Sequence, residues 1–300
     1  MIKRLENLIE IAKKREKKTL AVAAAADKYV LEAVATAVQL NIVSGILIGD
    51  EEKIKKIASE EGISLQDMKI IAEKDIKKSA DKAVELVRIK KADFIMKGMM
   101  NTSDILKAVL NKETGIKKEE LLSHVMVYEI PAYHKLIILT DGGMVTCPEL
   151  KDKIAIINNA VLAAKALEIT IPKVAVICAV ENVNISMNCT IDAAELAMMN
   201  KRGQIKNCIV DGPLGLDNAV SKKSAEHKGI ISELAGDADI LLVPDIESGN
   251  FLGKSLTYFA KAENAGIIVG AKCPIVLVSR SDSYKAKLYS IALGSLMGSN

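Results

Sequence analysis

The sequence predicts an α/β protein with two domains, built from mostly parallel strands and the helices that cover them. Its 300 residues are enough for two domains, and 50% of them are hydrophobic while only 3% are aromatic, so we expect an aliphatic core. Short apolar segments alternate with amphipathic helical patterns along most of the chain. Such alternation is typical of a parallel sheet with helices on both faces.

The first part of the chain shows this alternation most regularly. It begins with an amphipathic helix at residues 2–16. Strands are then expected at residues 20–25, 44–48, 70–71 and 94–96. Helices are expected after Asp27 to about residue 40, and at residues 51–58, 76–89 and 104–110. Because a helix usually connects two parallel strands, these elements predict one parallel sheet.

The pattern changes after Gly115. Strands at residues 125–130 and 136–139 are separated by a short loop, so they are expected to form an antiparallel hairpin, which indicates a second domain. That domain continues with helices at residues 154–166, 192–199 and 254–263, and with strands at residues 174–178, 208–210, 240–243 and 267–268. A strand from Ile275 then returns to the first sheet. The predicted domains are residues 1–122 with 275–300, and residues 123–274.

The strand from Ile275 ends in a polar turn, residues 279–283, that opens a helix. Open α/β sheets bind ligands at the carboxyl ends of strands, and the first turn of a helix favours an anion. Arg280 is the one arginine of five that follows an apolar strand, and its planar guanidinium suits phosphate or carboxylate. Ser and Asp are also ordinary N-cap residues, so a simple helix cap stays an equal alternative.

Four other polar loops follow predicted strands, at residues 97–103, 140–143, 211–214 and 244–250. Each of the first three is explained on its own by a turn or a helix cap. The last loop holds two carboxylates and Asn250, which could bind a metal or position a substrate. The three histidines lack metal-ligand spacing, and the G-x-G-x-x-G, G-x-S-x-G and H-E-x-x-H motifs are absent from the sequence. The sequence therefore predicts no metal site.

Composition argues against several classes of partner. The net charge is +3, and lysines alternate with glutamates on helical faces, which indicates a solvated surface and not a nucleic-acid interface. The five cysteines lack C-x-x-C spacing, which favours buried thiols in a reducing compartment. No apolar segment approaches the roughly 18 residues needed to cross a bilayer, and the amino terminus is unlike a signal peptide. We expect a soluble, cytoplasmic protein.

Taken together and in order, the polar loops resemble those of the phosphate acetyl/butyryltransferase family, with the shorter butyryl branch the most similar. The likeness covers nearly the whole chain. It is carried by Lys97-Gly98 with Thr102-Ser103-Asp104, Thr140-Asp141-Gly142-Gly143, Asp211-Gly212-Pro213-Leu214, Pro244-Asp245 with Gly249-Asn250, Lys261-Ala262-Glu263, and Pro274 with Ser279-Arg280.

The resemblance implies a two-domain fold similar to that of isocitrate and isopropylmalate dehydrogenases, an active site between the domains, and a homodimer. It implies reversible conversion of butanoyl-CoA and phosphate into butanoyl phosphate and coenzyme A through a ternary complex. Neither a metal, a prosthetic group nor a covalent enzyme intermediate is implied. The expected partners are acyl-CoA and inorganic phosphate.

The resemblance also gives roles to matching positions. Arg280 is expected to bind phosphate and the charge that develops in the transition state, and Ser279 to donate to the thiol, thiolate or oxyanion. Thr102 matches a phosphate-contacting threonine, and Asn250 lies on a loop that faces it. The other candidates for substrate or phosphate binding are Lys107, Lys254 and Tyr258.

Two features depart from the acetyl branch. Its acidic base corresponds to Ala286, and Asp282 lies one helical turn earlier, so we expect Asp282 to be the base, unless it caps the helix instead. Arginines of the acetyl branch correspond to Lys107 and Tyr258, which leaves fewer guanidinium groups for phosphate. Tyr258 is expected to shape a pocket for a longer acyl chain.

Three alternatives stay open at this point. The first is a phosphate acetyltransferase. The second is a metal- and NAD-dependent hydroxyacid dehydrogenase of the same architecture, which needs converging aspartates such as Asp141, Asp239 or Asp245. The third is a non-catalytic module that binds acyl-CoA or phosphate.

Overall fold

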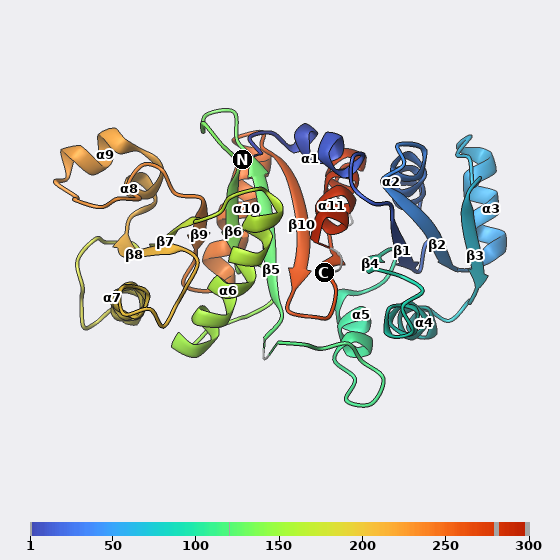
Figure 1. Ribbon diagram of the computed structural model, residues 1–300, viewed down its shortest axis with the longest axis horizontal. Helices are drawn as coiled ribbons and strands as arrows, with labels where there is room; N and C mark the ends of the chain where they lie inside the picture. Colours follow the sequence, from blue (N-terminus) through green and yellow to red (C-terminus); the bar gives the residue numbers. More distant parts are fainter. Residues whose placement is uncertain (1, 120, 279–281, 298–300) are drawn as a thin grey trace. The chain divides into compact units, whose positions relative to one another are not determined.

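The computed structural model describes residues 2–119, 121–278 and 282–297. The predicted site residues Ser279 and Arg280 lie outside the described residues. Figure 1 shows strands and helices alternating along the chain, as the sequence predicts. Within the described ranges, no helix has both the length and the apolar character needed to cross a membrane.

The chain divides into two compact units. We call Leu5–Leu122 with Ala265–Asn300 the first unit, and Met1–Arg4 with Ser123–Asn264 the second unit. The predicted domain boundaries lie between residues 122 and 123 and between residues 274 and 275. This division into domains stays a prediction.

The first unit contains a sheet in the order β3-β2-β1-β4-β11-β10. Its strands are β1 (Lys18–Ala23), β2 (Val43–Gly49), β3 (Met68–Ala72), β4 (Phe94–Lys97), β10 (Glu263–Val269, which begins in the second unit) and β11 (Ile275–Val276). Its helices are α1 (Leu5–Ala12), α2 (Lys28–Gln39), α3 (Glu51–Glu60), α4 (Ile76–Arg88), α5 (Thr102–Val109) and α11 (Tyr284–Met297). All neighbouring strands are parallel except β10 and β11.

Two sequence features explain this unit. Residues 20–23 of β1 and 94–96 of β4, the two central strands, are continuous apolar segments because helices cover both faces: α1, α2 and α11 lie on one face and α4 and α5 on the other (Figure 1). Aspartates at the N-cap positions fix three helix starts, since the Asp27, Asp50 and Asp75 side chains accept backbone N–H groups of α2, α3 and α4. As expected, the strand from Ile275 pairs with the first sheet, next to β4.

The second unit contains a sheet in the order β5-β6-β9-β7-β8. Its strands are β5 (Ser123–Glu129), β6 (Ile137–Thr140), β7 (Lys173–Ile177), β8 (Ile209–Leu214) and β9 (Ile240–Leu242). Its helices are α6 (Leu150–Ala166), α7 (Asn188–Lys201), α8 (Leu216–Val220), α9 (Lys222–His227) and α10 (Ile246–Tyr258). The hairpin of β5 and β6 is antiparallel, as predicted, and the other pairs are parallel.

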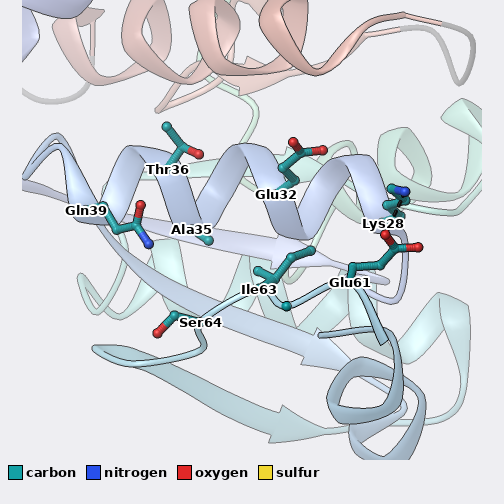
Figure 2. A pocket seen from close by; sticks show the side chains of 9 residues that line it. Lys28, Glu32, Ala35, Thr36, Gln39, Glu61, Ile63 and Ser64 are labelled. Atoms are coloured by element: carbon teal, nitrogen blue, oxygen red, sulfur yellow. Dashed lines mark ion pairs between the residues drawn. The ribbon is translucent and has the colours of Figure 1, made fainter. Parts of the chain in front are cut away.

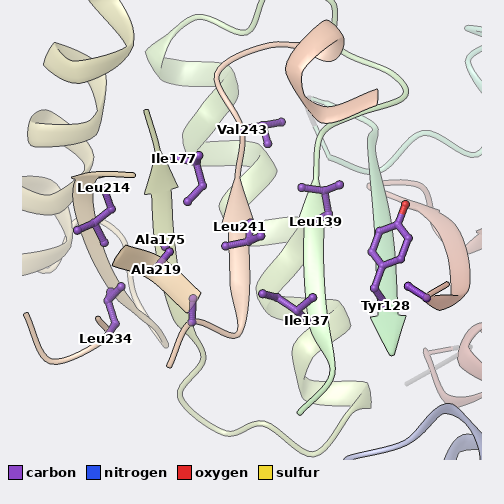
Figure 3. Close-up of a cluster of buried hydrophobic side chains, with 12 residues drawn as sticks. Tyr128, Ile137, Leu139, Ala175, Ile177, Leu214, Ala219, Leu234, Leu241 and Val243 are labelled. Carbon is purple, nitrogen blue, oxygen red and sulfur yellow. The ribbon is translucent and has the colours of Figure 1, made fainter. Parts of the chain in front are cut away.

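The core of the second unit is aliphatic, as the composition predicts. Figure 3 shows side chains from β6, β9, β7 and β8, among them Leu139, Leu241 and Ile177, gathered on one face of the sheet. Leu252 and Leu256 of α10 pack against this cluster. Burying such side chains contributes roughly 1.5–3 kcal/mol each, and this fixes α10 on the sheet.

Three predictions about this part of the chain were wrong in detail. The helix expected at residues 254–263 is α10, which starts at Ile246 because the Asp245 side chain accepts the Ser248 N–H at 2.8 Å. The helices α8 and α9 were not predicted, since each is short. Of the five free cysteines, expected to be buried, Cys147 is exposed and Cys189 is only partly buried.

Candidate active site

The carboxyl ends of β1, β4 and β11 meet at one edge of the first unit's sheet. These strands are parallel neighbours, since Leu20 of β1 pairs with Phe94 of β4, and Ile275 of β11 pairs with Ile95 of β4. The connections to α2, α5 and α11 therefore leave the sheet side by side. Such an edge is where open α/β sheets bind ligands.

Thr102 is the first residue of α5 and is half-buried at this edge. The turn before it packs against the end of β1, where Gly98 N–H donates to Ala23 O at 2.8 Å and Met99 N–H to Ala24 O at 2.8 Å. A Cβ at Gly98 would lie 2.2 Å from the Ala24 oxygen, so only glycine fits there. The Asn101 side chain forms no cap hydrogen bond, and the first turn of a helix such as α5 favours an anion.

Lys107 lies in the last turn of α5 and is exposed. It therefore lies at the opposite end of the helix from Thr102. An exposed lysine in the last turn also stabilises a helix through its dipole, so its position is explained without a ligand.

Asp282 precedes α11 at the same edge and is half-buried. Its carbonyl oxygen accepts a hydrogen bond from Lys287 Nζ at 2.7 Å. Ser283, directly before the helix, accepts the Ala286 N–H at 3.2 Å. The predicted base and the predicted phosphate-binding threonine thus lie on connections that follow adjacent strands.

Two buried lysines at this edge were not predicted as site residues. Lys97 ends β4, and Lys287 lies on α11; they are 5% and 3% exposed. Both line a small hollow, together with Asp27, Gly98 and Val278. Burial lowers the pKa of the Lys287 ammonium, against the opposing effect of the Asp282 and Asp27 carboxylates. The sequence gives one signal for Lys97, a lysine that directly follows an apolar strand.

The remaining candidates lie together on α10 of the second unit. Asn250, Lys254 and Tyr258 follow one another at intervals of four residues, so they lie along one side of the helix, and all three are exposed. Asn250 Nδ2 donates to Gly142 O at 3.4 Å.

Two glycines allow the loop after β6 to approach the start of α10 closely. A Cβ at Gly249 would lie 2.6 Å from the Gly142 Cα, so the start of α10 can approach the loop after β6 only without side chains at both positions. The structure therefore joins two of the loops that carry the family resemblance. The predicted site residues form two groups, one in each unit.

The three aspartates named for the dehydrogenase alternative lie at two opposite edges of the second unit's sheet. Asp141 follows β6 and accepts the N–H groups of Gly143 and Met144. Asp245 follows β9 and caps α10. Asp239 precedes β9, and because β6 and β9 are parallel, it lies at the opposite edge of the sheet. Among the described residues, no three His, Cys, Asp or Glu side chains are grouped to hold a metal ion. Asp239 is therefore separated from Asp141 and Asp245, and the three do not form one site.

A larger groove of about 330 Å³ lies beside α2 (Figure 2). It runs between α2 and the segment after α3, and Lys28 and Glu61 at one end form an ion pair of 2.6 Å. None of the predicted site residues lines it. The groove therefore offers no support for acyl transfer.

Comparisons with known proteins agree with the resemblance seen in the sequence. A family model described as phosphate acetyl/butaryl transferase matches residues 4–82 and 71–295. The chain is 49% identical over 300 residues to a phosphate butyryltransferase of Clostridium acetobutylicum, covering 100% of both chains.

Solved structures agree as well. The crystal structure of a branched-chain phosphotransacylase from Enterococcus faecalis V583 matches with a TM-score of 0.82 and 34% identity, covering 93% of this chain and 98% of that one. A 4-hydroxythreonine-4-phosphate dehydrogenase from Klebsiella pneumoniae matches with a TM-score of 0.54 and 11% identity over 94% of this chain and 99% of that one, a likeness in fold alone. The predicted α/β fold, shared by phosphotransacylases and a dehydrogenase, is confirmed.

Proposed function

Because the chain belongs to the phosphate acetyl/butaryl transferase family and is a phosphate acyltransferase, we propose that its preferred acyl group is butanoyl. In this proposal it converts butanoyl-CoA and inorganic phosphate reversibly into butanoyl phosphate and coenzyme A. The observation that carries the proposal is the 49% identity to a phosphate butyryltransferase over the full length of both chains. The likeness to a branched-chain phosphotransacylase also favours an acyl group larger than acetyl.

Phosphate is proposed to bind where α5 begins. The backbone N–H groups around Thr102 and the helix dipole favour an anion there. Arg280 and Ser279 are proposed to complete the phosphate and oxyanion contacts, as the motif implies. A phosphate oxygen attacks the thioester carbonyl carbon, the C–O bond forms, and the C–S bond then breaks as the coenzyme leaves as a thiolate.

Asp282 is proposed to carry the proton. In the direction of acyl-CoA synthesis its carboxylate takes the proton of the coenzyme thiol, and in the other direction it returns that proton to the leaving thiolate. Its place in the sequence, directly after Ser279-Arg280-Ser281, supports this role. We expect Asp282→Asn to lower kcat by about 10²-fold with a smaller change in KM. An unchanged kcat would show that another group is the base.

The exposed side of α10 is proposed to bind the coenzyme and the acyl chain. Lys254 suits a phosphate of the coenzyme, Asn250 can donate from its amide, and Tyr258, 56% exposed, presents a ring to the acyl chain. Lys107 is proposed to add positive charge near α5. The reaction is proposed to need neither a metal nor a prosthetic group.

The protein is further proposed to work as a homodimer in the cytoplasm. Exposed aromatic side chains, Phe251 within α10 and Phe259 directly after it, at 70% and 86% exposure, support a partner surface. The five free thiols suit a reducing compartment.

The test is phosphate-dependent release of free thiol from a series of acyl-CoA substrates, in the presence of a chelator. We expect kcat/KM to be higher for butanoyl-CoA than for acetyl-CoA, because a longer chain buries more apolar surface. A higher value for acetyl-CoA would identify a phosphate acetyltransferase instead.

A further inference from the structure

Two of the five cysteines lie against each other in the second unit. Cys178 directly follows β7, and Cys189 lies in the first turn of α7. The Cys178 thiol donates to the Cys189 carbonyl oxygen, with 3.3 Å between sulfur and oxygen. Because a carbonyl oxygen lies about 2.4 Å from its own Cα, the Cys178 sulfur lies within about 6 Å of the Cys189 Cα. The Cys189 side chain can therefore reach that sulfur with a small movement.

The two thiols differ in their surroundings. Burial raises the pKa of the Cys178 thiol to about 12, and the neighbouring Cys189 side chain adds to the rise through its charge and a hydrogen bond. Cys178 is 6% exposed, whereas Cys189 is partly exposed. A reagent in solution therefore meets Cys189 first, and Cys178 stays protonated behind it at neutral pH.

The backbone holds both cysteines in place. The Cys178 N–H donates to the Leu214 carbonyl oxygen at the end of β8 at 2.9 Å. At the other end of the connection, the side-chain oxygen of Thr190, which is fully buried beside Cys189, accepts the Asn184 N–H at 2.9 Å. Because the connection is fixed at both ends, joining the two thiols costs little further conformational entropy.

We propose that Cys178 and Cys189 form a reversible disulfide when the protein meets a small-molecule disulfide. The Cys189 thiolate attacks one sulfur of the oxidant, which forms a mixed disulfide and releases one thiolate that takes up a proton. Cys178 then loses its proton to water and attacks the Cys189 sulfur, which releases the second thiol. One small disulfide is thereby reduced to two thiols while two cysteines are oxidised to one disulfide.

The disulfide closes a ring of residues 178–189 at a defined edge of the sheet. The strands β7 and β9 are parallel neighbours, and β9 leads into α10, so the connection from β7 to α7 leaves the sheet at the edge where α10 begins. In a reducing compartment, disulfides are usually transient and sense oxidants. The proposal goes beyond acyl transfer and does not rest on the proposed function.

The test treats the folded, full-length protein with oxidised glutathione, blocks the remaining thiols, and maps the peptides by mass spectrometry without reduction. In most of the protein we expect a bond between residues 178 and 189 of one chain, with a mass loss of two hydrogen atoms that dithiothreitol reverses. Free thiols at both positions, or a mixed disulfide that stays on Cys189, would overturn the proposal. A bond from either cysteine to a different one would overturn it as well.

Three serine variants test the order of the two steps. In Cys178→Ser the reaction should stop at a mixed disulfide of glutathione on Cys189, and in Cys189→Ser the buried Cys178 should stay a free thiol. The matched control is Cys147→Ser, which removes an exposed thiol and should keep the cross-link at the wild-type yield. Equally fast glutathione attachment to Cys178 and to Cys189 in the two single variants would overturn the proposed order, and loss of the cross-link in Cys147→Ser would overturn the direct pairing.

Discussion

The two units bury lysines in different ways. In the second unit, Lys135 pairs with Asp239 at 2.7 Å and Lys153 with Asp192. In the first unit, Lys287 donates to a backbone carbonyl, and carbonyl oxygens accept from Lys97. A carboxylate neutralises a buried ammonium, whereas a carbonyl dipole does so only in part. The difference teaches that a direct carboxylate partner fixes the lysines of the second unit in the fold, whereas Lys287 is held by a backbone carbonyl while the Asp282 and Asp27 carboxylates act on it without a direct ion pair.

The largest effect on stability is expected at the paired lysines. Lys135→Met leaves the Asp239 carboxylate, 3% exposed, without its ammonium partner. We expect the free energy of unfolding to fall by about 3–5 kcal/mol, measured by urea denaturation. A loss below about 1 kcal/mol would contradict the claim that the paired lysines of the second unit stabilise the fold. The control is Lys135→Met with Asp239→Asn, which removes both charges and should recover part of the loss.

A smaller effect on stability is expected at Lys287. Lys287→Met removes a buried charge and one hydrogen bond to a carbonyl and leaves no buried carboxylate behind. We expect the free energy of unfolding to change by less than about 1 kcal/mol. A loss as large as that of Lys135→Met, in the same urea experiment, would show that Lys287 also serves the fold.

Acid is expected to destabilise the folded protein by protonating Asp237, which lies at the centre of an ion-pair network. Burial alone would raise the pKa of this carboxyl, but hydrogen bonds from Lys135, Lys173 and His134 outweigh burial and hold the pKa well below 3.8. A carboxyl with a lowered pKa stabilises the folded state above pH 3.8, and this contribution is lost as the pH falls below that value.

The measurement is unfolding by urea between neutral pH and pH 3. We expect stability to fall less steeply with acid in Asp237→Asn than in the wild type, and added salt should shrink this difference because the side chain is 41% exposed. Equal slopes for the two proteins would contradict the lowered pKa.

The smallest effect is expected at an exposed pair. Lys28 and Glu61, at the end of the groove in Figure 2, are 48% and 36% exposed. An exposed ion pair competes with water and is screened by salt, so Lys28→Met should change neither the Tm nor the KM for phosphate. A raised KM for phosphate in this variant would indicate that phosphate binds near α2.

Local sequence signals were enough to predict much of the fold. The hairpin of β5 and β6 was predictable because a short loop separates two apolar strands, and β11 could be placed in the first sheet because its strand follows the second series of elements. The start of α10 was missed because residues 247–250, near its start, are polar or glycine and lack a helical apolar pattern, while the Asp245 side chain fixes the start by accepting the Ser248 N–H.

The site was harder to predict for a physical reason. Lysine is solvated by default, so the sequence alone favours an exposed position for Lys287, and for Lys97 it gives one contrary signal, the apolar strand directly before it. Their burial depends on β4 and α11, which are far apart in the chain and are brought together by the pairing of β4 with β11. The contact between Asn250 and the Gly142 loop likewise depends on the parallel neighbours β6 and β9.

The account depends most on where phosphate binds. A crystal structure of the enzyme with phosphate tests this directly. We expect a phosphate oxygen within hydrogen-bond distance, about 2.7–3.2 Å, of a backbone N–H at the start of α5, where Thr102 lies. Phosphate bound away from the start of α5 would contradict the account.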